Sequence, residues 1–441
     1  MKEMSLKGKK FHIHTFGCQM NENDSEHVAG MLSSRGAHSS PSPELSDIVI
    51  INTCAVREKS EEKFFSLLGR LESIKKKKNL VIGAIGCIAQ LYKSQLRDKK
   101  SSIDFIVGPN NYDKIPDIIT HYWEEKITCT QWNRGWKEFS PSDIQRKNPT
   151  SGYVTIMRGC NNFCSYCIVP FTRGRERYRP MDYIIQEVHK LADQGYKEIQ
   201  LLGQNVNSYR DPSTGRDFAS LLEEVDRIPN IEWIRFLTSH PKNFTPRLAH
   251  TMKKSRKICR QLHLPLQSGS TSVLKRMNRK YSRENYLKLV GILKDLMKGI
   301  SLSTDIIVGY PGETEDEFQQ TLSLLNTVKY TNIFSFRYSP RPLTPASKLP
   351  DSVPFETKKK RLIKLQNEQK KIQIEKNKSF IGKTLKVLCL GRSKKDSSIY
   401  SGRNEGYQVV NFQSSSDVVG QFVPVKITQC GPYSLFGESV D

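Results

Sequence analysis

Three cysteines stand close together near the middle of the chain, as Cys160, Cys164 and Cys167, with the spacing C-x3-C-x2-C. Three thiolates at this spacing can bind three irons of a 4Fe–4S cube and leave the fourth iron open. A zinc site is the alternative, but structural zinc normally takes four ligands, and the next histidine is as distant as His189. We therefore predict a cluster whose open iron can chelate the amino and carboxylate groups of S-adenosylmethionine.

A second set of cysteines is spread over the first hundred residues. Cys18, Cys54 and Cys87 each follow an apolar run that predicts a β-strand, at residues 11–17, 48–53 and 80–86. The ends of parallel strands meet at one edge of a sheet, where ligands bind in such folds. A second cluster with an open iron is the prediction, and three small buried cysteines at strand ends are the alternative. The remaining cysteines show no such spacing and are read as structural: Cys129, Cys259, Cys389 and Cys430.

The elements around the second set alternate between strand and helix. A fourth strand is expected at 103–107, and helices at 25–34 and 61–74. This alternation predicts an α/β domain over residues 1–125, built as a doubly wound parallel sheet. Residues 126–150 show no periodicity and are predicted to be a linker.

A second alternating array follows over residues 151–378. Six strands separated by amphipathic segments predict an open, partial (β/α)6 barrel, with functional residues at the carboxyl ends of the strands. The expected strands are 153–158, 198–202, 233–237, 259–264, 302–308 and 332–337. A charged helix at 356–378 ends this region. Residues 379–441 alternate between apolar and polar side chains and predict a small β-barrel of a kind that holds oligonucleotides.

The cysteine loop resembles the radical S-adenosylmethionine superfamily, and almost the whole chain resembles the methylthiotransferases. The motifs that carry the resemblance are 15–21 (TFGCQMN), 52–57 (NTCAVR), 86–87 (GC), 158–160 (RGC), 169–170 (VP), 173–177 (RGRER), 202–206 (LGQNV), 239–241 (SHP), 264–269 (LPLQSG) and 309–314 (GYPGET). Residues 19–21 and 338–342 match best the branch that acts on isopentenyladenosine in tRNA. Tyr178 and Tyr310 depart from the expected Ser and Phe. The C-terminal segment resembles the RNA-binding TRAM domain of that family.

The resemblance implies a division of labour between two 4Fe–4S clusters. The cluster on Cys160, Cys164 and Cys167 would cleave S-adenosylmethionine to a radical that activates carbon 2 of the adenine. The cluster on the other triplet would hold the sulfur, which a second S-adenosylmethionine methylates. Such chemistry needs a cofactor because no side-chain base can remove that hydrogen.

Five further residues are candidates for contacts to S-adenosylmethionine. Tyr166 matches an aromatic residue that lies near the nucleoside in the superfamily, with loop packing as the alternative. Gln204 and Asn205 suit the amino-acid part, and Gln267 and Ser268 suit the ribose. For these four the alternative is hydrogen bonding that caps the strand ends.

The basic residues indicate a polyanionic partner. Lys and Arg number 69 against 45 Asp and Glu, a formal net charge of +24, and such an excess attracts nucleic acid. The alternative is an ordinary basic protein. If residues 173–179 are extended, alternate side chains share one face and form a phosphate-binding row; surface ion pairs with Glu176 or Asp182 are the alternative. The row consists of Arg173, Arg175, Arg177 and Arg179.

The remaining predictions concern location and partners. The N-terminus lacks the apolar stretch of a signal peptide, and no apolar run is long enough to span a membrane, so we expect a cytoplasmic monomer. The expected partners are the tRNA anticodon stem-loop, a reductant such as flavodoxin or ferredoxin, and a sulfur donor. A ribosomal-protein aspartate or threonylcarbamoyladenosine remains an alternative substrate. From another class, a non-catalytic iron–sulfur RNA-binding protein also remains open.

Overall fold

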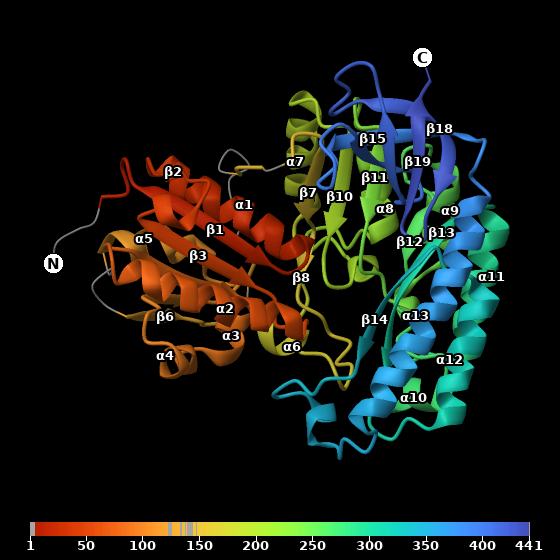
Figure 1. The fold of residues 1–441 in the computed structure, drawn as a ribbon, viewed down its shortest axis with the longest axis horizontal. Helices are drawn as coiled ribbons and strands as arrows, with labels where there is room; N and C mark the ends of the chain where they lie inside the picture. The colour runs from red at the N-terminus through yellow and green to blue at the C-terminus, as the bar shows by residue number, and fades with distance from the viewer. Residues whose placement is uncertain are drawn as a thin grey trace.

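The computed structural model describes residues 5–121, 126–132, 135, 136, 138, 144–146 and 148–440. Figure 1 shows an N-terminal α/β unit beside a central array of strands and helices, with a small β-barrel at the C-terminus packed on one end of that array. No helix among these residues has the length and apolar character needed to cross a membrane.

The N-terminal unit is built on a fully parallel sheet. Its strands are β1 (Lys10–Phe16), β2 (His38–Ser39), β3 (Ile48–Thr53), β4 (Val81–Gly86), β5 (Phe105–Val107) and β6 (Ile127–Cys129), in the order β2-β1-β3-β4-β5-β6. The predicted doubly wound parallel sheet is confirmed, and the strand order reverses between β1 and β3. The edge strand β6 lies inside the predicted linker, so the sheet continues past residue 125.

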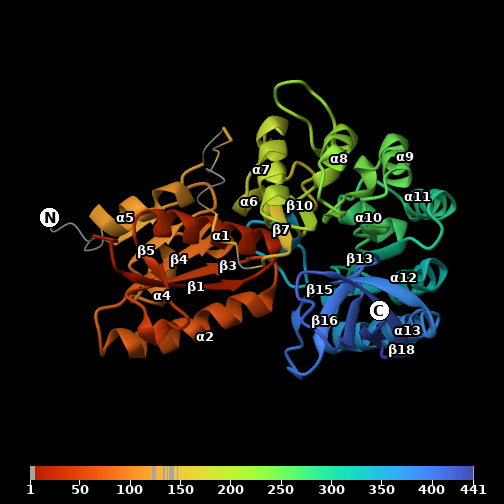
Figure 2. The same cartoon turned by 90° about the horizontal axis from the view of Figure 1, so that it is seen from above.

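Helices cover both faces of this sheet. Helices α1 (Gln19–Ser34) and α5 (Ile115–His121) lie on one face, and α2 (Glu58–Lys75), α3 (Cys87–Tyr92) and α4 (Gln95–Lys99) on the other (Figure 2). In β3, Ile48 and Ile50 pack on the α1 side while Val49 and Ile51 pack on the α2 side. Burial on both faces explains why this strand is an unbroken apolar run instead of an alternating one.

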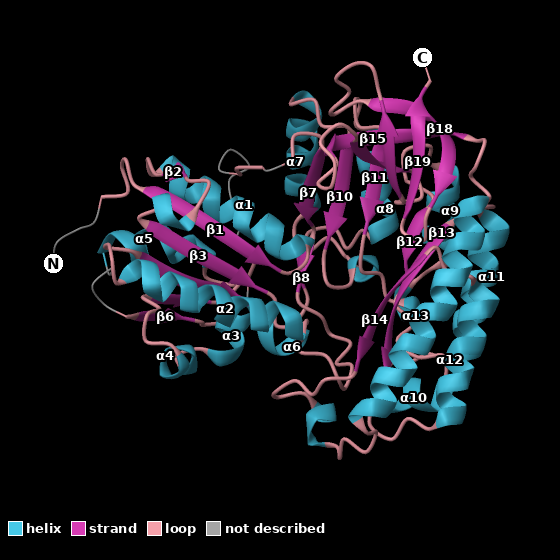
Figure 3. Cartoon of the chain, in the orientation of Figure 1, coloured by secondary structure: helices cyan, strands magenta, loops and turns pink. Residues whose placement is uncertain are grey.

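The central array is an open barrel, as predicted. Its strands are β7 (Ser151–Thr155), β10 (Glu198–Leu202), β11 (Trp233–Phe236), β12 (Gln261–His263), β13 (Ser301–Val308) and β14 (Asn332–Arg337). They form two parallel sheets, β11-β10-β7 and β12-β13-β14, which a single bridge between Ile234 and Ile258 connects. The helices outside them are α7 (Met181–Asp193), α8 (Phe218–Arg227), α9 (Pro246–Lys254), α10 (Thr271–Arg276), α11 (Arg283–Leu296), α12 (Glu315–Val328) and α13 (Phe355–Lys378) (Figure 3).

The C-terminal residues form the predicted small barrel. Strands β15 (Thr384–Arg392), β16 (Tyr400–Asn404), β17 (Val409–Gln413), β18 (Phe422–Cys430) and β19 (Ser434–Ser439) close in the order β15-β16-β17-β19-β18. Alternate side chains point into its core, among them Val423, Val425 and Ile427 of β18.

This small barrel is joined to the central array through a buried arginine. The Arg235 side chain is fully buried, forms an ion pair with Glu198 at 2.5 Å, and donates hydrogen bonds to the carbonyl oxygens of Asn404 and Glu405 at 2.8 and 2.7 Å. Next to it, the ring of Trp233 lies 4.6 Å from that of Phe422. The two units therefore share a packed interface.

Replacing Arg235 by Ala should destabilise the protein strongly. The change leaves the Glu198 carboxylate buried without its cation, and removing one partner of a buried pair costs about 3–5 kcal/mol. Thermal unfolding followed by circular dichroism measures the effect. Arg227→Ala is the control, because the Arg227–Glu224 pair is exposed and is worth at most about 1 kcal/mol. Equal melting temperatures for the two variants would contradict the role given to Arg235.

Candidate metal and cofactor site

The first cysteine triplet lies at the carboxyl edge of the N-terminal sheet. Cys18 follows β1 and caps α1, Cys54 follows β3, and Cys87 begins α3 directly after β4. The strand order reverses between the first two of these strands, the point where open α/β sheets bind ligands. Gly86 has φ +92°, and a Cβ there would meet Asn52 Oδ1 at 2.4 Å, so only glycine lets the chain turn into Cys87.

The thiols of this triplet interact with one another. A hydrogen bond with Cys54 is the main cause that lowers the pKa of Cys18 to about 6. The same hydrogen bond, burial and the charge of Cys87 raise the pKa of Cys54 well above its ordinary value. Behind them, Asn21 Nδ2 donates to Asn52 Oδ1 at 2.9 Å and ties the loop after β1 to the end of β3. The structure therefore brings these three predicted ligands together.

The second triplet lies on a loop whose two ends are held together by a pair of short strands. Strands β8 (Met157–Arg158) and β9 (Arg177–Tyr178) pair antiparallel on either side of it. Gly159 has φ +83°, and a Cβ there would lie 2.0 Å from the carbonyl oxygen of Arg175, so the loop is closed tightly at its neck. Burial, followed by the charges of Cys164 and Cys160 among other causes, raises the pKa of Cys167 to about 12. These three thiols also lie together.

Four of the six sulfurs accept an N–H hydrogen bond. The donors are Val56 N to Cys54 at 3.3 Å, Arg173 Nε to Cys87 at 3.4 Å, Asn162 Nδ2 to Cys160 at 3.4 Å and Arg279 Nη1 to Cys164 at 3.3 Å. Two of these donors are buried guanidinium groups. A buried cation beside a sulfur favours the thiolate form that binds iron, so the surroundings of both triplets suit iron–sulfur ligation.

Within the described residues, no three cysteine, histidine or acidic side chains converge as they would around one metal ion. In a 4Fe–4S cube each thiolate binds a different iron. Ligation of a cluster by each triplet stays the prediction that the sequence makes.

The segment that follows the second triplet packs against the unit that carries the first. Helix α6 (Val169–Thr172), just after the second triplet, packs on α3, which begins at Cys87. Arg173 then reaches back into the N-terminal unit, where it pairs with Asp24 of α1 at 2.7 Å besides contacting the Cys87 sulfur. Asp24 is fully buried, and Arg158 lies 3.8 Å from its other oxygen. The same arginine thus connects both cysteine-bearing units.

The predicted arginine row does not form. Arg173 and Arg179 are buried, and Arg179 pairs with Glu138 and Glu187. Arg177 contacts Asn110, and only Arg175 is exposed, with its guanidinium 4.1 Å from the ring centre of Phe163. The segment is not extended, because α6 ends at Thr172 and the next residues turn. As in the alternative, Arg173 and Arg179 form ion pairs, but their partners are Asp24, Glu138 and Glu187 and not Glu176 or Asp182.

Gln204 and Asn205, the predicted ligand contacts after β10, form hydrogen bonds within the protein through some of their polar atoms but not all. Gln204 Oε1 accepts from Gly159 N and supports the neck of the cysteine loop. Asn205 Nδ2 donates to Glu176 and Asn243, both at 3.2 Å, but the buried Asn205 Oδ1 has no hydrogen-bond partner. A buried acceptor without a partner is costly, so this atom is available to a ligand.

Two polar groups after the neighbouring strand β11 also lack a hydrogen-bond partner. Ser239 Oγ and His240 Nε2 are buried without a hydrogen-bond partner. Burial, Arg279 and Lys242 lower the pKa of His240 to about 2, so the ring is neutral, and its Nδ1 accepts from Lys242 N at 3.2 Å. Nε2 therefore carries the proton and can donate. The SHP motif contains both residues, but no role follows from the sequence alone.

Gln267, Ser268 and Tyr166 are built into the protein. Gln267 has φ +74° and pairs with β13, and the buried Ser268 Oγ lies 3.4 Å from Thr321 Oγ1. Tyr166 packs against the apolar cluster around Tyr310 and accepts a hydrogen bond from Arg279 at 3.4 Å. Loop packing of Tyr166 and hydrogen bonding of Gln267 and Ser268 near strand ends are the contacts that the alternative interpretations predict. A role of these three residues toward S-adenosylmethionine stays a prediction.

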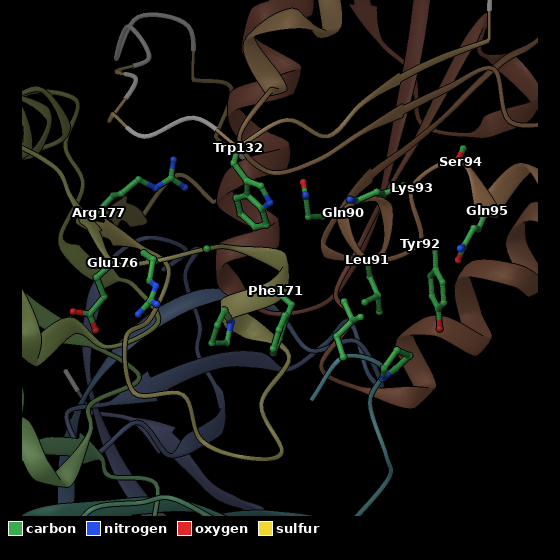
Figure 4. Close-up of a pocket in the computed structure, with 15 residues that line it drawn as sticks. Gln90, Leu91, Tyr92, Lys93, Ser94, Gln95, Trp132, Phe171, Glu176 and Arg177 are labelled. Atoms are coloured by element: carbon green, nitrogen blue, oxygen red, sulfur yellow. The ribbon is translucent and has the colours of Figure 1, made fainter. Parts of the chain in front are cut away.

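Two cavities lie at the interface between the N-terminal unit and the central array. A cavity of about 900 Å³ lies between α3 and the end of the cysteine loop, with Trp132, Phe171 and Arg177 on its walls (Figure 4). A second cavity, of about 600 Å³, lies between α2 and β14. Both cavities are lined by residues of the N-terminal unit and of the central array.

Comparisons with known proteins agree with this architecture. Residues 154–325 match the model of the radical SAM superfamily, residues 10–108 match the uncharacterized protein family UPF0004, and residues 378–440 match the TRAM domain. Among solved structures, the chain is similar to the radical S-adenosylmethionine methyltransferase TsrM from Kitasatospora setae. With cobalamin and a [4Fe-4S] cluster bound, that structure has a TM-score of 0.55 at 12% identity and covers 77% of each chain, a likeness in fold.

Curated relatives match from end to end. The tRNA-2-methylthio-N(6)-dimethylallyladenosine synthase of Acetivibrio thermocellus is 46% identical over 100% of this chain and 93% of its own length. The synthase of the same name from Clostridium novyi is 44% identical over 99% of this chain and 98% of its own. With the two cysteine triplets, the open barrel and the TRAM barrel in place, this chain belongs to the tRNA-2-methylthio-N(6)-dimethylallyladenosine synthase family of the radical SAM superfamily.

Proposed function

We propose that the two cysteine triplets divide the work of a tRNA methylthiotransferase between two 4Fe–4S clusters. Cys160, Cys164 and Cys167 hold the cluster that binds S-adenosylmethionine, and Cys18, Cys54 and Cys87 hold the cluster that handles sulfur. The observation that carries the proposal is the shared interface, where Arg173 links the loop after one triplet to a sulfur of the other. The adenine of isopentenyladenosine next to the anticodon is the substrate.

The protein's own groups position the reactants. When bound, the clusters supply the electron and the sulfur that side chains cannot provide. Arg279 and Arg173 donate N–H hydrogen bonds to the sulfurs of Cys164 and Cys87 and hold these side chains in place. Asp24, buried beside Arg173, offsets its charge.

The amino-acid part of S-adenosylmethionine is proposed to bind at the ends of β10 and β11. Asn205 Oδ1 accepts a hydrogen bond from its amino group, and the buried groups Ser239 Oγ and His240 Nε2, which have no partner in the protein, donate to its carboxylate. Gln204 positions the cysteine loop through Gly159. Gln267, Ser268 and Tyr166 are assigned to the nucleoside side, where Tyr166 lies beside Cys167 in the loop.

The partners follow from this chemistry. The TRAM barrel and the exposed Arg175 are proposed to contact tRNA phosphates, while Arg173, Arg177 and Arg179 shape the interface instead. A reductant such as flavodoxin or ferredoxin supplies electrons, a sulfur donor renews the second cluster, and the enzyme acts as a cytoplasmic monomer. Homology disfavours a ribosomal-protein aspartate or threonylcarbamoyladenosine as substrate, because the curated relatives are named for dimethylallyladenosine.

Substitutions in the two triplets should separate the two roles. Protein reconstituted without oxygen should carry about eight irons, four for each triplet. Cys164→Ala should abolish 5′-deoxyadenosine formation, because the cluster that binds S-adenosylmethionine loses a ligand. Cys54→Ala should keep 5′-deoxyadenosine formation and lose methylthio transfer. Iron content and both products, measured by mass spectrometry, check the assignment, with Cys389→Ala as a control distant from both triplets.

The roles would be assigned wrongly if Cys54→Ala lost 5′-deoxyadenosine formation while retaining the four irons of the other triplet. Stoichiometric zinc with little iron in protein purified without oxygen would contradict the clusters themselves.

Turnover should depend on the isopentenyl group of the substrate. An anticodon stem-loop with isopentenyladenosine should be methylthiolated. The same stem-loop with unmodified adenosine at that position should react poorly. Burying the five carbons of the group can contribute about 3–4 kcal/mol, at about 0.8 kcal/mol for each methylene-sized unit. Product formed on the paired stem-loops measures this preference. Equal turnover of the two RNAs, or methylthiolation of a ribosomal-protein peptide, would refute the substrate assignment.

A further inference from the structure

Strand β14, at the open edge of the barrel, exposes two large aromatic side chains on one face. Phe334 is 42% exposed and Phe336 is 37% exposed. Residues two apart on a strand share a face. Between them, Ser335 points the other way and accepts a hydrogen bond from Gln366 of α13 at 3.1 Å. The helix therefore covers one face of this strand and leaves the phenylalanine face open.

These phenylalanines line the cavity of about 600 Å³ between the barrel and the N-terminal unit. Thr15, Phe16 and Gly17 form part of the opposite wall, directly before Cys18. On the barrel side, the ring of His263 lies 5.8 Å from that of Phe334. The cavity thus extends from an apolar floor to the residues that directly precede Cys18, the first of the proposed sulfur-handling ligands.

The remaining wall is basic. Arg57, Lys59 and Lys63 come from the start of α2 and the residue before it, and all three are exposed. Neither a salt bridge nor a side-chain hydrogen bond engages them within the described part of the chain. The same helix also carries Glu61, but that carboxylate accepts from Tyr92. Three unengaged cations beside an aromatic floor complement a single-stranded nucleotide, which presents phosphates and a base.

We propose that Phe334 and Phe336 form the platform for the isopentenyl-bearing adenine of the tRNA, and that Arg57, Lys59 and Lys63 bind the phosphates beside it. This inference rests on the proposed function and names the part of the site that recognises the substrate. A planar base and a branched five-carbon group both bury apolar area on two adjacent rings. The position next to Cys18 places the base beside the cluster that supplies sulfur.

The test compares the binding of two anticodon stem-loops, identical except for the isopentenyl group, to the reconstituted enzyme. Dissociation constants come from fluorescence anisotropy at fixed salt without oxygen. The wild type should prefer the prenylated RNA by about 100-fold, given the area that the group buries. The double variant Phe334→Ala/Phe336→Ala should reduce this preference to below about tenfold, and Phe334→Leu/Phe336→Leu should restore part of it. Tyr183→Ala, which removes an exposed ring on α7, should leave it unchanged.

The basic wall should act on both RNAs alike. Lys59→Ala/Lys63→Ala should weaken the two stem-loops by the same factor and reduce the log–log salt slope by about 1.4, at about 0.7 for each phosphate contact on a single strand. Lys76→Ala/Lys77→Ala, beyond the far end of α2, is the charge-matched control. Iron content verifies that each variant is assembled.

The outcomes separate this inference from the proposed function. If wild-type protein methylthiolates the prenylated stem-loop but the phenylalanine double variant keeps the full preference, the platform is refuted and the function stands. The platform is also refuted if that variant weakens both RNAs equally. If the wild type neither prefers nor modifies the prenylated RNA, the proposed function and the platform both fail.

Discussion

The buried ion pair between Asp24 and Arg173 is the contact on which the arrangement of the two cysteine triplets depends. Both side chains are almost completely buried, and Arg173 also donates to the Cys87 sulfur. Removing one member of such a pair leaves an uncompensated charge and costs several kcal/mol, so the two units cannot separate at this point without a large penalty. A reaction that brings a sulfur and an activated carbon together at one base needs this fixed spacing.

The same interface explains an unusual helix. The first turns of α1 bury a run of polar side chains: Asn21, Asn23, Asp24, Ser25, Glu26 and His27. Asn21, Asn23, Asp24 and Ser25 hydrogen-bond with side chains of other elements, as where Thr155 Oγ1 of β7 donates to Asn23 Oδ1 at 2.6 Å. Burial and three nearby arginines hold the pKa of His27 well below its usual value, which keeps the ring neutral. Buried polar groups of this kind define one geometry, because any shift leaves them without partners.

Most of the fold could be predicted from the sequence because the strands are apolar runs at regular intervals. The six cysteines could be predicted as metal ligands because three thiols at a fixed spacing have few other uses. The edge strands β2 and β6 were missed, since two or three residues carry no periodic signal. The sequence predicts helix α1 only from residue 25, because residues 19–24 are polar except for Met20, although the helix begins at Gln19. The arginine row failed since Gly174, at φ +81°, turns the chain. Asp24 and Arg279 contact partners 149 and 115 residues away, a separation that no local pattern reveals.

The opening of the barrel determines where a substrate can enter. The strand β7 at one edge receives the N-terminal unit through Asn23, which donates to the carbonyl oxygen of Tyr153 at 3.3 Å. Near the other edge, Arg341 donates to the carbonyl oxygen of Val56 at 3.1 Å. The N-terminal unit therefore occupies the place of the strands that would close a full barrel. In a closed barrel the inward face of β14 would be core, but here the cavity beside α2 leaves that apolar face accessible. An adenine that enters there meets walls from both units, so recognition and sulfur transfer depend on one shared opening.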